Sequence, residues 1–412
     1  MCELIFGHRL PIRQGSSGWQ RARTWFCLSL ISCSASTALF ADAPTALQKA
    51  PGPPPTAAAV PPLATFSPPI AGELTAPTRP LATGLGASVG VTRGSYSSAP
   101  AMVGDSFGGS FLVDEVGPVP GNEIQTISIA GGDRRFKIAE NGSPIPRDRV
   151  FFNYNHFENA LTDHLGRSIA MDRYTAGIEK TFIDQLMSLE LRLPLAQGLN
   201  STQDLASGDT RGAELSNLSV ALKGILIRGP EWLVSGGSTM TLPTADGYIE
   251  AYQGDRYRFV DNDAVHMAPF IGWLLLPRPK WFVQGFMQTD FDLNGNRVRS
   301  SASGNEGILQ DQNLLFVDAS VGHWLMQRSA MTSRLQGIAV ISELHYTMTM
   351  NDADMVDGIG NPYQHVDLLN MTAAFHFQFR RASLRLGGAA PLRDDEERLF
   401  DAEIIAQWSR GF

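Results

Sequence analysis

The feature that most constrains the fold is a repeat of paired, alternating segments joined by very short turns. These turns centre on Asp184, on Gly229 and Pro230, on Arg278, on Arg328, and on Arg380 and Arg381, so successive centres lie roughly 45 to 52 residues apart. A period of about 50 residues with two long alternating segments per unit is typical of a repeated β-hairpin. From residue 150 onward the sequence therefore predicts a chain of hairpins.

The predicted strands number 12, and several reach ten residues or more. Strands in soluble proteins usually run about 5–6 residues, whereas a tilted strand that crosses a membrane needs about 9–11. An even number of long strands favours an all-β fold, an up-and-down antiparallel barrel that spans a membrane, over a β-propeller with about four short strands per period. The strands are assigned to residues 150–157, 173–182, 187–195, 215–227, 231–242, 265–276, 280–291, 314–326, 331–348, 366–377, 383–392 and 400–412.

Most of these segments have one apolar and one polar face. In residues 187–195, Leu189, Leu191 and Leu193 alternate with Glu190 and Arg192. One face suits lipid and the other suits a polar lumen. Residues 265–276 and 280–291 are less regular, and the pattern does not assign their faces. The candidate lumen-lining residues carry both signs of charge, and they are Glu179, Glu190, Arg192, Lys223, Asp318, Glu343, His345, Arg385 and Glu403.

The connections between strands differ in length on the two sides. Five are short turns, and the others are longer and polar, as outer-membrane barrels have on their periplasmic and extracellular sides. The tryptophans of this region lie near a short turn or near the C-terminus, where an aromatic girdle at the membrane interface is expected. They are Trp232, Trp273, Trp281, Trp324 and Trp408.

The last strand resembles a known signal. Ile404, Ala406, Trp408 and Phe412 share one parity, and Phe412 is the terminal residue. This is similar to the C-terminal assembly signal of bacterial outer-membrane barrels, although Arg410 departs from the usual apolar residue. The resemblance implies that Trp408 and Phe412 serve assembly, that the barrel-assembly machinery and outer-membrane lipid are partners, and that the protein is located in the bacterial outer membrane.

A second resemblance lies at the start of the predicted barrel. Residues 143–155, SPIPRDRVFFNYN, look like the opening of an uncharacterised, porin- or transporter-like family of outer-membrane β-barrel proteins. The resemblance covers roughly residues 124–412. It implies a fold and a location, and it implies no particular substrate.

The N-terminal region has the properties of an export signal with a long n-region. Two arginines precede an apolar stretch at residues 25–31, and residues 41–43, Ala-Asp-Ala, have the spacing of a signal-peptidase site. Residues 1–43 are therefore expected to be a signal peptide. In an alternative, residues 30–33 form a lipoprotein processing site that leaves Cys33 lipidated. The other cysteines, Cys2 and Cys27, lie in the same region, so the remaining chain has no disulfide.

Three further regions follow the signal. Residues 44–104 are expected to be a disordered linker rich in Pro, Ala and Thr, because residues 44–80 alone hold 11 prolines and little that could form a core. Residues 105–149 are expected to be a lead-in to the barrel or a plug within it. Residues 150–412 are expected to be the transmembrane barrel.

Candidate chemical sites are few. The sequence has no H-E-x-x-H and no Cys-His metal set, and we expect no enzyme. Asp290, Asp292 and Asn294 have the spacing of a calcium-binding loop, but its closing Glu is missing. A looser acidic cluster consists of Asp352, Asp354 and Asp357. Loop-bound calcium is the one metal that these residues suggest, and no cofactor is expected.

The composition limits the partners and the function. A net charge of -8 argues against a nucleic-acid partner, and 18% charged residues argue against a bundle of transmembrane helices. Barrels of about eight strands are filled by side chains, whereas those of about sixteen or more leave an open channel. Twelve strands predict a narrow pore or facilitated transporter for small solutes. The alternative is a non-conducting barrel that acts as an anchor or an outer-membrane enzyme. The mixed charges fit a salt-bridged plug as well as a polar pore, and the oligomeric state stays open.

Overall fold

The structure is a computed structural model, and its described residues all lie within Thr83–Phe412. The predicted signal peptide, Cys33 and most of the predicted linker lie outside the described residues. No helix among the described residues is long and apolar enough to cross a membrane. The described residues are 99–105, 111–113, 125–127, 135–162, 168–197, 201–204, 212–252, 254–301, 304, 306–328, 333–352, 354–357, 359–360, 367–393 and 397–412.

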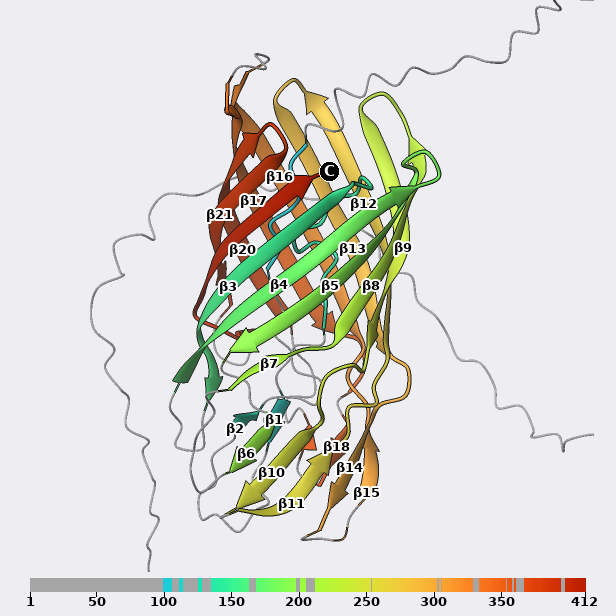
Figure 1. Cartoon of the computed structure of the whole chain (residues 1–412), viewed down its shortest axis with the longest axis vertical. Coiled ribbons are helices and arrows are strands. Elements are labelled where there is room, and N and C mark those ends of the chain that lie inside the picture. The colour runs from blue at the N-terminus through green and yellow to red at the C-terminus, as the bar shows by residue number, and fades with distance from the viewer. Residues whose placement is uncertain are drawn as a thin grey trace, which may run out of the picture. The chain divides into compact units, whose positions relative to one another are not determined.

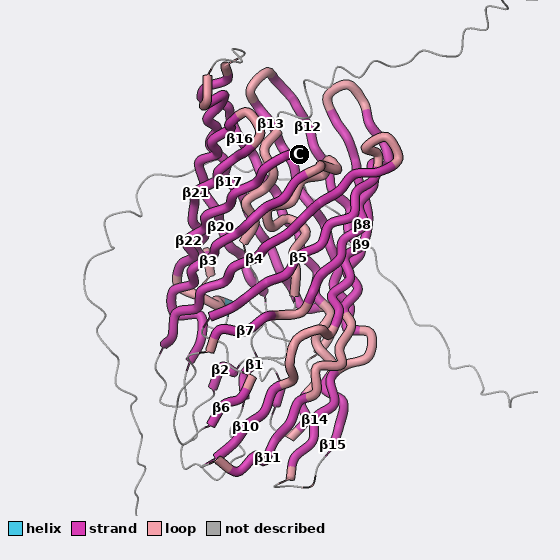
Figure 2. The backbone as a smooth tube through the Cα atoms, in the orientation of Figure 1, coloured by secondary structure: helices cyan, strands magenta, loops and turns pink. Residues whose placement is uncertain are grey.

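The central element is a closed antiparallel barrel of twelve strands, as the sequence predicted (Figures 1 and 2). Each strand pairs with the next along the barrel, and the connections after β4, β8, β12, β16 and β20 are short. The strands are β3 (Arg149–Thr162), β4 (Ser168–Phe182), β5 (Met187–Gln197), β8 (Leu218–Arg228), β9 (Trp232–Leu242), β12 (His266–Arg278), β13 (Trp281–Asp292), β16 (Leu314–Gln327), β17 (Leu335–Thr349), β20 (Asp367–Phe379), β21 (Ala382–Pro391) and β22 (Ala402–Gly411).

The barrel closes between its first and last strands. β22 pairs antiparallel with β3 in a register that runs from Ala402 opposite Glu158 to Gly411 opposite Arg149. This closure is the one predicted from the need to leave no strand edge exposed to lipid. The single continuous sheet also excludes the alternative of a β-propeller.

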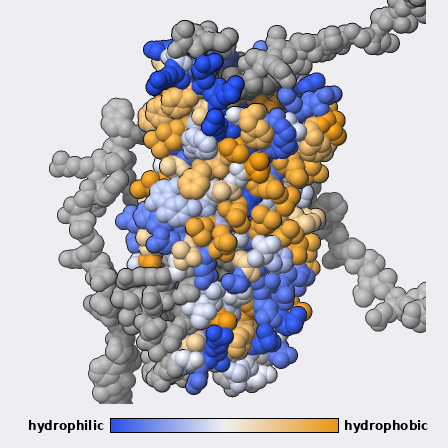
Figure 3. Space-filling model, in the orientation of Figure 1, coloured by the Kyte–Doolittle hydropathy of each residue, from blue (hydrophilic) through white to orange (hydrophobic). Residues whose placement is uncertain are grey.

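The two faces of the barrel wall differ as the alternation predicted. On β5, Leu191 and Leu193 are 39% and 42% exposed on the outside, whereas Glu190 and Arg192 point inward and are 2% exposed. Figure 3 shows apolar side chains gathered over the barrel strands and polar ones at the two ends. An apolar outer band on a closed antiparallel barrel is the form of a bacterial outer-membrane protein, so the chain is located there.

The two strands whose faces the sequence did not assign carry apolar side chains on both faces. On β12 and β13, Phe270, Leu274, Phe282 and Phe286 point inward and are at most 4% exposed. These side chains face the N-terminal segment that fills the lumen (below), so part of the inner wall is apolar. That inner apolar surface is the reason for the irregular pattern.

The tryptophans lie near the expected end of the barrel, but not all face lipid. Trp232, Trp281 and Trp408 are 40–43% exposed on the outside. Trp324 is 4% exposed and points inward, so its place in the predicted girdle is wrong. Its ring lies over Gly337, where a Cβ atom would come within 2.4 Å of it, so the neighbouring strand makes room for the indole.

The connections at the other end of the barrel are structured, whereas the sequence predicted polar loops. One small sheet has the order β15-β14-β11-β10-β6, and a second has the order β18-β19-β1-β2 (Figure 1). Tyr248, Val260, Val298, Leu309 and Ile359 form an apolar core there. The strands are β6 (Thr202–Asp204), β10 (Tyr248–Tyr252), β11 (Asp255–Val260), β14 (Asn296–Ser300), β15 (Glu306–Leu309), β1 (Phe111–Val113), β2 (Gln125–Ile127), β18 (Met355–Val356) and β19 (Ile359–Gly360), while β7 (Ala213–Leu215) extends the barrel sheet beside β5.

We name the two ends by their connections. The turn end carries the short turns and the C-terminus, and the loop end carries the small sheets (Figure 1). In outer-membrane barrels the short turns face the periplasm and the long loops face the exterior.

Candidate functional site

The lumen holds a segment of the chain that precedes the first barrel strand. Residues 99–105, here called the outward arm, lie along the inside of the wall. Their contacts move steadily from the turn end toward the loop end: Gln284 donates to the Pro100 carbonyl at 2.9 Å, and Asn370 donates to the Asp105 carboxylate at 2.7 Å. Because Gln284 follows the start of β13 at the turn end and Asn370 follows the start of β20 at the loop end, the arm runs along the barrel.

The chain returns through the same lumen. Residues 135–148, here called the return arm, begin at the loop end, where Arg135 donates to the Gln312 carbonyl at 2.7 Å. They finish at the turn end, where the Arg147 amide donates to Glu179 at 3.1 Å. Between the two arms, β1 and β2 pair with each other and β1 pairs with β19 at the loop end. The chain thus passes along the lumen twice before it enters β3.

The two arms, together called the plug, bind each other inside the barrel. The Met102 amide donates to the Gly142 carbonyl at 2.7 Å, and the Asn141 amide donates to the Val103 carbonyl at 3.2 Å. Met102 and Ile138 also pack in one apolar cluster with inward-facing phenylalanines of β12 and β13. Backbone groups of an irregular segment can lie at membrane depth only if protein or water satisfies them, and here the arms and the wall do so.

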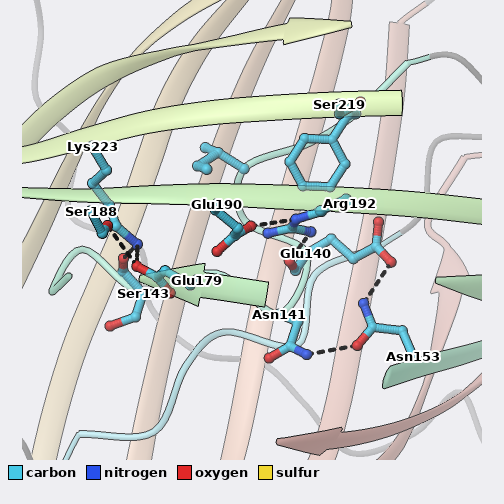
Figure 4. A network of polar contacts seen from close by, with 12 residues as sticks. Glu140, Asn141, Ser143, Asn153, Glu179, Ser188, Glu190, Arg192, Ser219 and Lys223 are labelled. Atoms are coloured by element: carbon cyan, nitrogen blue, oxygen red, sulfur yellow. Dashed lines mark hydrogen bonds and ion pairs between the residues drawn. The ribbon is translucent and has the colours of Figure 1, made fainter. Parts of the chain in front are cut away.

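One side of the lumen holds a network of ion pairs (Figure 4). Glu179 accepts from Arg149 at 2.7 Å and from Lys223 at 2.9 Å, and Arg149 also reaches Glu190 at 2.9 Å. Arg192 pairs with Glu190 and donates to the Glu140 carbonyl of the return arm at 2.7 Å. The charges that alternation turned inward therefore compensate one another and hold the plug.

A second network joins the opposite wall to the outward arm. Both oxygens of Glu343 accept the Val103 amide, at 3.0 and 3.1 Å, and Oε2 also accepts the Gly104 amide at 2.7 Å. His345 Nδ1 lies 2.7 Å from Asp318 and 3.3 Å from Asp105, and Lys137 reaches Asp105 at 2.8 Å. His345 thus contacts carboxylates of both the wall and the plug, and Lys137 pairs with the Asp105 carboxylate of the plug.

Two further inward-facing residues, Arg385 and Glu403, form hydrogen bonds with uncharged groups. Arg385 is 2% exposed and donates to Gln407 at 2.9 Å, to the Ala101 carbonyl at 3.3 Å and to Asn141, so these hydrogen-bond acceptors are all uncharged. Glu403 accepts from Asn155 at 2.7 Å. All nine residues proposed from the sequence to line the lumen are inside the barrel and at most 2% exposed. The structure brings them together around the plug, and their part in solute passage stays a prediction.

Several residues of the predicted calcium loops contact neighbouring groups of the protein. Asp292 accepts the backbone amides of Asn294, Gly295 and Asp311, and Asp290 lies 2.8 Å from His266. Asn294 donates its side-chain amide to the Asp263 carbonyl. These three side chains thus stabilise the loop end directly. In the second cluster Asp357 lies 3.5 Å from Arg258, and Asp354 is exposed.

Several important residues precede the predicted barrel and were not found from the sequence. Asn141 contacts Asn153, Arg149 and Arg385, and Glu140 binds Arg173 at 2.7 Å. Residues 99–104 of the outward arm lie within the region expected to be a linker. The irregular inner faces of β12 and β13 were the one sequence signal that something apolar fills the lumen.

Some solved structures are similar to this chain at low identity. No protein-family model matches the sequence, and no curated protein matches it. An outer-membrane channel from Pseudomonas putida F1 is similar at 13% identity with a TM-score of 0.45, over 66% of this chain and 97% of that one. The β domain of the Bordetella autotransporter Brka is similar at 11% identity with a TM-score of 0.41, over 64% and 99% of the chains. The NanC porin is similar at 9% identity with a TM-score of 0.36, over 64% and 98%.

Likenesses at these identities and TM-scores assign no role to this chain. The lipid-facing exterior, the closed sheet of twelve strands and the polar interior are those of an outer-membrane protein. The chain is an outer-membrane β-barrel protein whose lumen is occupied by residues 99–105 and 135–148, which precede the first barrel strand.

Proposed function

We propose that the protein is a gated channel for small solutes, in which the plug must move before a solute can pass. The observation that carries this proposal is the way in which the wall holds the outward arm. Gln284 and Gln407 donate to plug carbonyls, and Glu343 accepts plug amides. These bonds are non-covalent and polar, so water can replace them when the plug leaves.

The charged inner wall supports the same conclusion. If the plug left, the ion pairs between wall residues, such as Arg149 with Glu179 and Lys223 with Glu179, would stay intact in a hydrated lumen. Ion pairs in water contribute only about 0–1 kcal/mol, so hydration of these groups would not destabilise the barrel greatly. The proposal gives the barrel a transport role and no catalytic one.

A second candidate is a permanently closed barrel that anchors the N-terminal region. The observation in its favour is the apolar contact between plug and wall. Ala99 and Val103 pack in one cluster with Leu274 and Phe282. Opening would expose this apolar surface to water, at roughly 25 cal/mol per Å². The two candidates therefore differ in the free energy that separates the closed state from an open one.

Recordings from planar bilayers distinguish them. The chain is refolded as wild type and as the double variant Gln284→Ala and Gln407→Ala, which removes two bonds from wall to plug. A gated channel gives rare openings in the wild type and more frequent openings of the same conductance in the variant. Met287→Ala, which changes an exposed side chain on the outer face of β13, is the matched control and leaves the open fraction unchanged. If none of the three proteins opens, the anchor replaces the channel.

A further inference from the structure

A pocket of about 530 Å³ opens at the turn end of the barrel. It is formed by the connection between β16 and β17, the turn between β20 and β21, the end of β22, and the last residues of the return arm. The inward-facing side chains of Trp324 and Ser409 also line it, so it lies on the lumen side of the turns. It is therefore the periplasmic vestibule of the barrel, immediately before the plug.

The charge of this vestibule is strongly positive. Its lining includes Arg147, Arg149, Arg328, Arg380 and Arg381, and one acidic residue (Asp148). Arg149 is paired with glutamates of the lumen network. The other four arginines form no ion pair with any residue that the structure describes. Arg328, Arg380 and Arg381 are exposed, and their side chains are free to turn toward a ligand.

Asp148 does not neutralise this charge. Its carboxylate accepts the Thr181 amide and hydroxyl at 2.8 and 2.9 Å and pairs with Lys180 at 3.2 Å. The hydrogen bond from the Thr181 amide, helped by Lys180, holds the pKa of Asp148 below its usual value, so the group is ionised and already bound. Among the described residues, no carboxylate forms an ion pair with the guanidinium groups of Arg147, Arg328, Arg380 and Arg381 in the vestibule.

We infer that the vestibule binds small solutes that carry phosphate or carboxylate groups. The planar guanidinium group donates two parallel hydrogen bonds to such anions, and several guanidiniums around one concave site attract a multivalent anion most strongly. This inference rests on the proposed channel for its biological meaning, because it names the class of solute. The binding itself needs no opening, since the vestibule lies outside the closed plug.

The position of the pocket favours a free solute over a lipid headgroup. Lipid contacts the outer face of the barrel, whereas Trp324, Ser409 and Arg149 of the pocket point inward. Both sources offer the same phosphate chemistry, so the experiment includes an arm for each.

Calorimetric titration of the full-length protein in a non-ionic detergent tests the inference. Tripolyphosphate is the probe, inorganic phosphate is a weaker anion of the same class, and glucose is a neutral control. Tripolyphosphate should bind once per chain, more tightly than phosphate, and glucose should not bind. Each of R328Q, R380Q and R381Q should weaken the binding roughly threefold to fivefold, because a charge about 5 Å from the ligand contributes that much in water. Added salt should weaken it further.

R410Q is the matched control, because Arg410 is an exposed arginine at the same end of the barrel that does not line the pocket. Its affinity for tripolyphosphate should equal that of the wild type. Equal binding by the wild type and by a variant that combines R328Q, R380Q and R381Q would overturn the site. So would binding of phosphatidylglycerol vesicles with no binding of soluble tripolyphosphate. Bilayer recordings report on the channel separately, since a protein that never opens can still bind the anion, and one that opens can fail to bind it.

Discussion

Glu343→Gln should release the outward arm from the wall. Glu343 is 1% exposed, and its carboxylate accepts the amides of Val103 and Gly104. A glutamine has one acceptor oxygen, so its NH2 group must face a backbone N–H. A hydrogen bond to a charged group contributes about 1.5–3 kcal/mol, so the loss of charge and of one acceptor should cost about 3 kcal/mol of docking free energy. That corresponds to a roughly 100-fold rise in the undocked fraction.

Limited trypsin digestion measures this fraction. Lys137 lies in the return arm with a 1% exposed side chain, so trypsin can cut after it only when the plug undocks. Where docking is faster than cleavage, the cleavage rate follows the undocked population. We expect cleavage after Lys137, identified by mass spectrometry, to be about 100-fold faster in the variant, given that estimate of docking free energy. Leu344→Ala, on the lipid face beside Glu343, should cleave at the wild-type rate. Unchanged cleavage in a correctly folded Glu343→Gln barrel would refute the argument.

Three other predictions concern the barrel and its loop end. Deletion of Phe412, which is 60% exposed and lies against Lys180, should block insertion and leave export intact, and normal heat-modifiable mobility in an outer-membrane fraction would contradict this. Leu191→Arg should destabilise the barrel by about 2–4 kcal/mol in urea titrations in lipid vesicles, whereas Arg192→Ala should still insert, and the reverse order would invert the assigned faces. Val298→Asp puts a charge into the apolar core of the small sheets at the loop end, and it should make these sheets sensitive to protease while the barrel keeps its heat-modifiable mobility on gels. Loss of the barrel as well would show that the barrel and the small sheets fold as one unit.

The barrel was largely predictable because its wall follows a local rule. On β5 the alternate side chains Leu189, Leu191 and Leu193 must face lipid, so the inward direction of Glu190 and Arg192 followed from the period of the strand alone. The pairing of β3 with β22 followed from the need to close the sheet. Neither inference required knowledge of any long-range contact.

The plug was not predictable in the same way. Its two arms have no strand period, and Glu343 holds Val103 across 240 positions of the chain. Trp324 was placed on the wrong face because distance from a turn fixes the depth of a side chain and leaves its direction open. The two small sheets at the loop end were missed because their strands, such as Glu306–Leu309, are much shorter than the barrel strands, which were recognised by their length.

Hydrogen exchange of the plug tests the central claim most directly. The amides of Met102, Val103, Gly104, Ile138 and Asn141 are bonded to the other arm or to the wall. In the wild-type protein in lipid vesicles, peptides from residues 99–105 and 135–148 should therefore exchange slowly, over minutes to hours, as barrel strands do. Complete exchange of both peptides within seconds, with the barrel strands still protected, would contradict a lumen filled by the chain's own N-terminal segment.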